Sequence, residues 1–204
     1  VLLPHVCASR CTRLRVGYSL LLGLLAISLP VVQAPAETVV GVWTNRYNAV
    51  TAASAVANKC VSAADGNVIV SGDCDAGITK SDIVTIKYSA NGLPIWTNRY
   101  NGPANDGDSA AAVAVDGSGN VVVTGESHNG SNFDYYTAKY AAGDGLLLWE
   151  KRYNGPANFN DYVHGVVVVG SGNVVVTGES HNGVSDNPSS DYYTAKYAAA
   201  DGLL

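Results

Sequence analysis

The sequence predicts an all-β fold, a β-propeller of four-stranded antiparallel blades, with about three blades in its 204 residues. Three observations carry this prediction. Val, Ala and Tyr supply most of the apolar content beside 22 Gly, a composition that favours strands over helices. Trp43, Trp96 and Trp149 are spaced 53 residues apart, close to the period of a propeller blade. Each repeat also divides into four short strand-like runs separated by turn residues, which is the pattern of one blade.

The first 36 residues are predicted to be a secretory signal peptide. Residues 1–15 carry three arginines and no acid, residues 16–32 are uncharged and apolar, and Ala34-Pro35-Ala36 offers an A-x-A cleavage site. The alternative is an uncleaved anchor, because the apolar run is only slightly shorter than a membrane span. Cleavage is favoured, so we expect a protein that is secreted or held at the cell surface, with no membrane insertion afterwards.

Cleavage would leave an acidic chain. The chain has 12 Lys and Arg, and removal of Arg10, Arg13 and Arg15 leaves 9 of them against 17 Asp and Glu. Nucleic acid is excluded as a partner because its phosphates need a basic face. An anionic membrane surface is excluded for the same reason.

Residues 37–204 are predicted to form the repeat domain. It begins with an isolated fourth strand at 39–48, and the units 49–101, 102–154 and 155–204 follow. Closed propellers typically have 4–8 blades, so about three blades indicate a fragment of a larger propeller. The exposed blade edges are then expected to be covered by the remaining blades of a longer chain or by self-association.

The second unit shows why each run is expected to be a strand. "SAAAVAV" (109–115) has the small residues that fit beside the axis of a propeller, and "NVVVTG" (120–125) is rich in β-branched residues. "DYYTAKY" (134–140) carries large side chains on both faces, as a strand between two neighbouring blades requires. "LLLWEKRY" (146–153) contains the recurring Trp. "DGSG" and "AAGDG" are turns, and "ESHNGSNF" (126–133) is a loop.

Three stretches resemble a known family. "AVAVDGSGNVVVTG", "DYYTAKY" and "LWEKRYNGPAN" are similar to the SBBP repeats of bacterial secreted β-propeller proteins, and the resemblance extends from about Gly41 onward. It implies a propeller, usually of seven blades, on exported or surface proteins without established catalysis. The first unit departs from the pattern, with Ala63-Ala64 in place of Asp-Gly before the turn.

Cys60 and Cys74 could form a disulfide in an oxidising compartment. A tight hairpin turn about Asp65-Gly66 would place Cys60 opposite Ser71 rather than Cys74. A slip of three residues amounts to about 10 Å along a strand and also changes the face. Free thiols are therefore favoured, and a bridge stays open only if the chain folds back after Gly72.

The repeated stretch "GNVVVTGESHNG" (119–130 and 172–183) is the sharpest functional candidate. Its loop and the blade-to-blade crossings are expected to emerge on one face, and their polar groups suit sugar hydroxyls or a cation. A metal ion is disfavoured because equivalent loops lie too far apart to share one ion. A structural turn copied with its blade is favoured over a ligand site. The candidate ligand-binding residues are Asn101, Asp106, Asp108, His128, Asn129, Asn154, Asp161, His181 and Asn182.

No catalytic residue, metal ligand or cofactor is predicted. "DGSGN" (116–120) has the start of a calcium loop, but Val121 stands where the bend needs Gly, so a hairpin turn is favoured. The repeating Lys and Arg are interpreted as structural ladders with neighbouring carboxylates. We therefore expect a non-catalytic binding or scaffold module whose partner is a carbohydrate or a surface protein. The alternative is part of a polysaccharide-active propeller enzyme whose catalytic residues lie outside these units.

Overall fold

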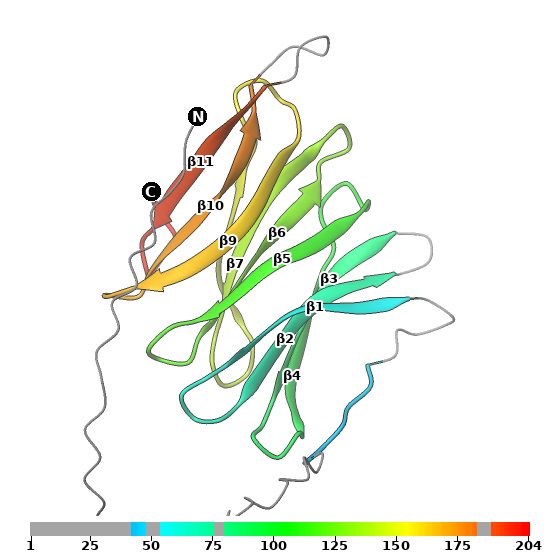
Figure 1. The fold of residues 1–204 in the computed structure, drawn as a ribbon, viewed down its shortest axis with the longest axis vertical. Helices are drawn as coiled ribbons and strands as arrows, with labels where there is room; N and C mark the ends of the chain where they lie inside the picture. The colour runs from blue at the N-terminus through cyan, green and yellow to red at the C-terminus, as the bar shows by residue number, and fades with distance from the viewer. Residues whose placement is uncertain (1–41, 48–53, 76–79, 183–188) are drawn as a thin grey trace, which may run out of the picture. The chain divides into compact units, whose positions relative to one another are not determined.

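The computed structural model describes residues 42–47, 54–75, 80–182 and 189–204. These residues are all-β, with eleven strands and no helix, and their strands form three antiparallel sheets (Figure 1). The predicted signal peptide at 1–36 lies outside the described residues.

Each sheet is a simple meander in which strands that follow one another in the chain are paired. The first sheet comprises β1 (Ala55–Ser62), β2 (Val68–Asp75), β3 (Ser81–Tyr88) and β4 (Pro94–Tyr100). The second comprises β5 (Asp108–Val115), β6 (Val121–His128), β7 (Phe133–Tyr140) and β8 (Leu147–Tyr153). The third comprises β9 (Asp161–Val169), β10 (Asn173–His181) and β11 (Ser190–Tyr197), with β10 in the middle.

The first hairpin of each sheet closes through a three-residue loop with Gly in the left-handed region. In the second sheet, Gly119 donates to the Asp116 carbonyl at 2.9 Å and Asp116 N–H donates to the Asn120 carbonyl at 2.9 Å. Gly119 has φ 82°, and the equivalent Gly66 and Gly172 have φ 80° and 86°. This is a type I turn followed by a glycine bulge, so "DGSGN" is a hairpin turn.

The same loop corrects the expected position of the cysteines. The loop holds one residue more than a two-residue turn, so Cys60 lies opposite Val70 and not Ser71. Cys74 lies opposite Ala55, near the other end of the hairpin. Both are free thiols, Cys60 exposed and Cys74 buried.

The first strand of one sheet packs on the face of the sheet before it. β5 contacts β1, β2 and β3, and β9 contacts β5, β6 and β7, so β1, β5 and β9 lie next to one another (Figure 1). The first interface is a buried cluster that includes Ile69, Ile83, Val121, Val123 and Tyr136. The second includes Val122, Tyr135, Val174, Val176 and Tyr197. Seven of the eight residues of β7 are buried, which confirms the prediction that this strand is covered on both faces.

Two polar contacts recur at both interfaces. Lys87 Nζ and Trp96 Nε1 of the first sheet donate to the Ala142 carbonyl of the second, at 2.8 and 3.3 Å. Lys139 and Trp149 donate in the same way to the Ala199 carbonyl of the third sheet, at 3.0 and 3.2 Å. The repeating Trp and Lys therefore join each sheet to the next.

Two expected elements differ from the structure. The described part of the isolated fourth strand, residues 42–47, is not a strand. β4 and β8 pair with β3 and β7 of their own sheets, whereas 42–47 has no such strand beside it among the described residues. The loop expected at 126–133 is also shorter, because β6 continues to His128, which pairs with Phe133.

Candidate functional site

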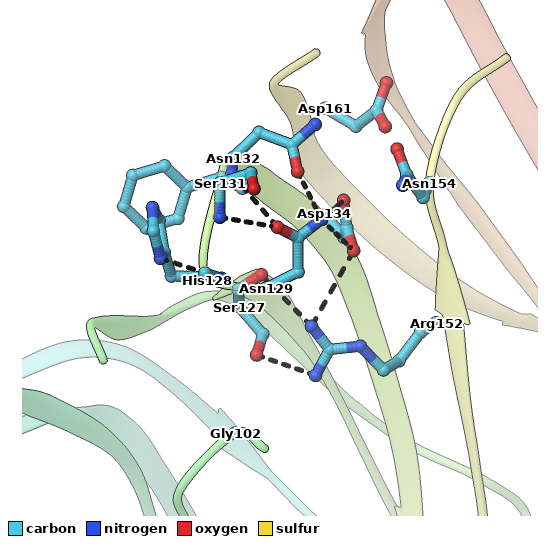
Figure 2. Close-up of polar contacts among 12 residues, drawn as sticks. Gly102, Ser127, His128, Asn129, Ser131, Asn132, Asp134, Arg152, Asn154 and Asp161 are labelled. Carbon is cyan, nitrogen blue, oxygen red and sulfur yellow. Dashed lines mark hydrogen bonds and ion pairs between the residues drawn. The ribbon is translucent and has the colours of Figure 1, made fainter. Parts of the chain in front are cut away.

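The candidate residues lie at one edge of the sheets, which we call the loop edge. It consists of the crossing loops at 101–107 and 154–160 and the ends of the hairpins β6–β7 and β10–β11. Figure 2 shows the part of this edge around His128, where side chains from a crossing loop, a hairpin and β8 meet.

Both crossing loops are held by their own polar side chains. Asp108, the first residue of β5, accepts a hydrogen bond from Gly102 N–H at 2.6 Å. Asn101 donates to the side-chain oxygen of Asn105 at 2.6 Å, and Asn105 has φ 54°, a conformation that Asn tolerates better than most residues. The second crossing loop repeats both contacts at the same distances, through Asp161, Gly155, Asn154 and Asn158.

Asp108 and Asp161 are buried, each with one carboxylate oxygen that has no hydrogen-bond partner among the described residues. Burial raises the pKa of Asp108, against hydrogen bonds from Ser127 and Gly102 that lower it. Glycine is required beside this carboxylate because a Cβ at position 102 would lie 2.5 Å from Ser127 Oγ. Both aspartates therefore have a structural role: they hold the crossing loops at the base of the loop edge.

Asn129 organises the β6–β7 hairpin. Its side-chain oxygen accepts from Ser131 and Asn132 N–H at 2.9 and 3.0 Å. Its amide donates to both carboxylate oxygens of Asp134 at 3.1 Å (Figure 2). In the next hairpin, Asn182 donates to one carboxylate oxygen of Asp191. These two candidates are thus occupied by contacts within their own loops.

Arg152 ties the loop edge of the second sheet to the first. Its guanidinium donates to Tyr100 Oη at 2.6 Å. It also donates to Ser127 Oγ at 2.9 Å and lies 3.8 Å from Asp134 Oδ2 (Figure 2). Arg99 and Asp82 form the matching pair in the first sheet at 2.5 Å. The prediction that the repeating arginines form structural contacts with neighbouring carboxylates is confirmed for these two.

The two histidines of the repeated motif have different partners. His128 Nδ1 lies 3.4 Å from Asp106 Oδ2. Asp106 is also paired with Lys80 at 2.5 Å, and this hydrogen bond holds the pKa of its carboxyl below the usual range. His181 Nδ1 instead lies 2.5 Å from the Asn160 carbonyl. The difference follows from the crossing loops, because Phe159 occupies in "NGPANFND" the place of Asp106 in "NGPANDGD".

A row of four rings crosses the loop edge from the second sheet to the third, and we call it the aromatic row. His128 meets Phe133 edge-on with centroids 4.9 Å apart, Phe133 lies 6.3 Å from Tyr162, and Tyr162 meets His181 edge-on at 5.8 Å. All four side chains are partly exposed. The row therefore offers ring edges and faces beside the Asp106 carboxylate.

Sequence reasoning missed Phe133 and Tyr162. Both break the repeat, since Ser81 and Ser190 stand at the positions equivalent to Phe133, and Ser109 stands at the position equivalent to Tyr162. The first unit has Val56 at the position of Tyr162. A large aromatic ring at a position that has a smaller residue in the sister units was the signal that could have found them.

Glu126 is a second unusual acid, two residues before His128 in β6. It occupies in β6 the position of Asp73 in β2, and burial raises its pKa to about 7, with a further contribution from the Asp73 charge. The N–H of Val163 in β9 donates to it and acts against this rise. Glu126 thus belongs to the contact between the second and third sheets.

Within the described ranges, no group of three or more His, Cys, Asp and Glu side chains is arranged to hold a metal ion. The described residues also contain no helix that is long and apolar enough to cross a membrane. Comparison of the chain with protein-family models gave no match, and neither did comparison with curated protein sequences.

Proposed function

We propose that the chain is an exported, non-catalytic β-propeller module of the SBBP-like type, and that its loop edge binds carbohydrate. The observation that carries the proposal is the aromatic row, because it places rings at the loop edge where both sister units have serine in place of Phe133 and the second unit has Ser109 in place of Tyr162. A structural repeat alone would not require these substitutions.

The propeller arrangement is supported by how the sheets meet. Each of the two complete sheets is a four-stranded meander, and the first strand of a following sheet packs on the face of the sheet before it. The same Lys and Trp contacts recur at both interfaces. Radial repetition of one four-stranded unit through one kind of interface is the principle of a propeller.

Carbohydrate is the ligand class that fits the chemistry of the loop edge. Aromatic rings present apolar surface with a polarised face and edge, and a few convergent polar groups beside such surface fix a ligand's orientation. Phe133 and Tyr162 supply the apolar surface, and Asp106 and the exposed side chain of Asn105 supply acceptors and a donor. A sugar offers both a C–H face and hydroxyl groups to this combination.

The test is binding of the chain to a panel of immobilised polysaccharides, followed by titration of the best one. Phe133→Ser and Tyr162→Ser each introduce the residue of a sister unit, so they should fold and yet bind about tenfold more weakly or worse. Leu146→Ser is the control, because Leu146 is an exposed apolar residue beyond the other end of β7, away from the aromatic row, and its substitution should leave binding unchanged.

Absence of binding to every polysaccharide, or equal affinity of the wild type and both serine variants, would refute the carbohydrate proposal. Release of reducing ends from a bound polysaccharide would overturn its non-catalytic part and favour the enzyme alternative.

A further inference from the structure

We infer that the chain associates head to tail with a second copy of itself. In this contact, the third sheet of one copy takes residues 42–47 of the other as its fourth strand and packs its open face on the other copy's first sheet. The inference concerns the sheet faces and does not rest on the carbohydrate proposal.

The first observation is a contrast between two identical strands. Residues 134–140 of β7 and 191–197 of β11 have the same sequence, "DYYTAKY". Tyr135 is 1% exposed, whereas its equivalent Tyr192 is 98% exposed. In β7 this side chain packs on the third sheet, so β11 presents the same surface to solvent without the neighbour that covers it in β7.

The second observation is that the outer edge of β11 lacks a described partner strand, while residues 42–47 have the sequence of such a strand. β7 pairs along its outer edge with β8, but no described strand pairs with the outer edge of β11. Residues 42–47, "VWTNRY", repeat "IWTNRY" of β4 and are not in a strand. In β4, Asn98 lies opposite Thr85 of β3. The same register places Asn45 of one copy opposite Thr194 of the other.

The third observation is a hollow on the first sheet. It has a volume of about 380 Å³, and its lining includes Val70, Val84, Ile86 and Tyr88. The equivalent residues of the second sheet are Val123, Tyr136, Ala138 and Tyr140, and all four lie in the buried cluster of the first interface. In the first sheet, Val84, Ile86 and Tyr88 form a separate cluster with Trp43 packed against it.

At the first interface, the matching surface of the second sheet is covered by Ile69 and Ile83. The residues equivalent to Ile69 and Ile83 in the third sheet are Val175 and Tyr192. Val175 is partly exposed and Tyr192 is almost fully exposed. The third sheet therefore carries the side chains that this hollow would receive.

The polar contacts of the two internal interfaces extend to the proposed one. The Ala142 and Ala199 carbonyls each accept from a Trp and a Lys. The equivalent Ala90 carbonyl accepts from Trp43 at 3.1 Å, and the exposed Lys196 of a second copy would complete the set. Likewise Asp73 accepts from Ala110 N–H at 2.8 Å across the first interface, and Glu179 would accept from Ala57 N–H across the proposed one.

We assign a second copy of the chain to this contact, because one copy supplies residues 42–47, the hollow on the first sheet and the polar partners together. Two copies joined in this way repeat an interface that the chain already contains twice. Head-to-tail contacts of this kind form rings where the rotation closes and filaments where it does not.

The decisive test is a disulfide between two single-cysteine variants of the full chain. The four cysteines are first replaced by serine, which already stands at the positions equivalent to Cys74, namely Ser127 and Ser180. Directly opposed strand residues have Cα atoms about 4.5–5.5 Å apart, within disulfide range. Thr194→Cys and Asn45→Cys, mixed under mild oxidation, should therefore form a cross-linked dimer.

Neither variant alone should cross-link, because a head-to-tail contact does not bring two copies of one position together. Asp191→Cys mixed with Asn45→Cys is the register control, displaced by about 10 Å along the strand, and should cross-link far less. Cross-linking of either variant alone to the same extent as the mixture, or no cross-link in the mixture, would overturn the inference.

Sedimentation across a concentration series gives an independent measurement. Tyr192→Glu places a charge in the proposed contact but leaves residues 1–47 unchanged, and it should weaken association of the full chain by about tenfold or more. An unchanged association constant, or a wild-type chain that stays monomeric throughout the series, would contradict the head-to-tail contact.

Discussion

Lys139 and Asp116 form a buried ion pair, with Nζ 2.9 Å from Oδ2 and side chains that are 4% and 6% exposed. Burial opposes ionisation of Asp116, but hydrogen bonds from Lys139 and Asn120 outweigh it and hold the pKa of Asp116 below its usual range. In the first sheet, Ala63 stands at the position equivalent to Asp116, and Lys87, the equivalent of Lys139, is also buried. The ion pair is thus specific to the second sheet.

Asp116→Ala should lower the free energy of unfolding by about 2–4 kcal/mol, because it leaves the Lys139 ammonium buried without its counter-charge. Asp65→Ala is the control, since Asp65 accepts from Asn67 N–H in an exposed turn and its loss should cost about 1 kcal/mol. Urea unfolding of both variants measures the difference, and equal losses would contradict the role of the ion pair.

Tyr135 and Tyr192 provide a matched pair of substitutions in the same local sequence. Tyr135→Ala should destabilise the fold by about 3–5 kcal/mol, whereas Tyr192→Ala in dilute protein should change stability by less than about 0.5 kcal/mol. Thermal or urea unfolding distinguishes them.

Tyr135→Phe should be neutral or stabilising. The Tyr135 hydroxyl is buried and has no hydrogen-bond partner among the described residues, and removal of an unsatisfied buried hydroxyl costs nothing in lost bonding. A loss of more than about 1 kcal/mol on urea unfolding would show that this hydroxyl has a partner after all.

Glu126 should make stability fall as the pH rises from about 4.5 to about 7. Its pKa in the folded state is raised to about 7 from the ordinary value of 4.5, so across this window the folded chain retains a proton that the unfolded chain has released. Glu126→Gln should therefore be more stable than the wild type at pH 8, by on the order of 2 kcal/mol, and equally stable near pH 4.

Glu179→Gln is the control for this pH dependence, because Glu179 occupies the same position in the third sheet with a side chain that is 40% exposed. In dilute protein, where copies are not associated, the dependence of its free energy of unfolding on pH should follow that of the wild type. If both glutamine variants responded alike to pH, the burial of Glu126 would not be the cause.

Gly125 should not tolerate a side chain. A Cβ there would lie 1.9 Å from the Ser109 carbonyl oxygen of β5, so Gly125→Ala should cost about 3 kcal/mol or more through overpacking. At Gly117 a Cβ would meet no atom within 4 Å, so Gly117→Ala should change stability by less than about 0.5 kcal/mol. Thermal unfolding of the two variants tests the contrast.

The sequence predicted the strands of the second unit well because alternation and turn residues are local signals. The predicted partner of Cys60 was wrong by one residue, because the hairpin loop holds three residues and a two-residue turn was assumed. No side chain in the loop indicates which of the two lengths it has. Residues 42–47, the described part of the strand expected at 39–48, are not a strand. They resemble β4 in sequence, but strand formation also needs a partner strand, which sequence similarity does not supply.

At the loop edge, the structure shows what the repeated polar residues contact within the fold. Asn129 and Asp108 recur because they hold their loops together, so their repetition reports structure. Phe133 and Tyr162 became apparent only when the structure placed them beside the histidines. The contact between Phe133 and Tyr162 joins two units, and a contact of this kind cannot be derived from the pattern of one unit.

The recurrence of one interface has a consequence for how such a chain grows. The second sheet has a neighbour on each side, so its amides should exchange more slowly than those of the other two sheets, and unfolding should begin at the ends. A tandem duplication of one 53-residue unit then adds a whole nearest-neighbour interface whose two halves are already encoded. Gene duplication would be stabilising at once, before any further mutation adapts the new copy.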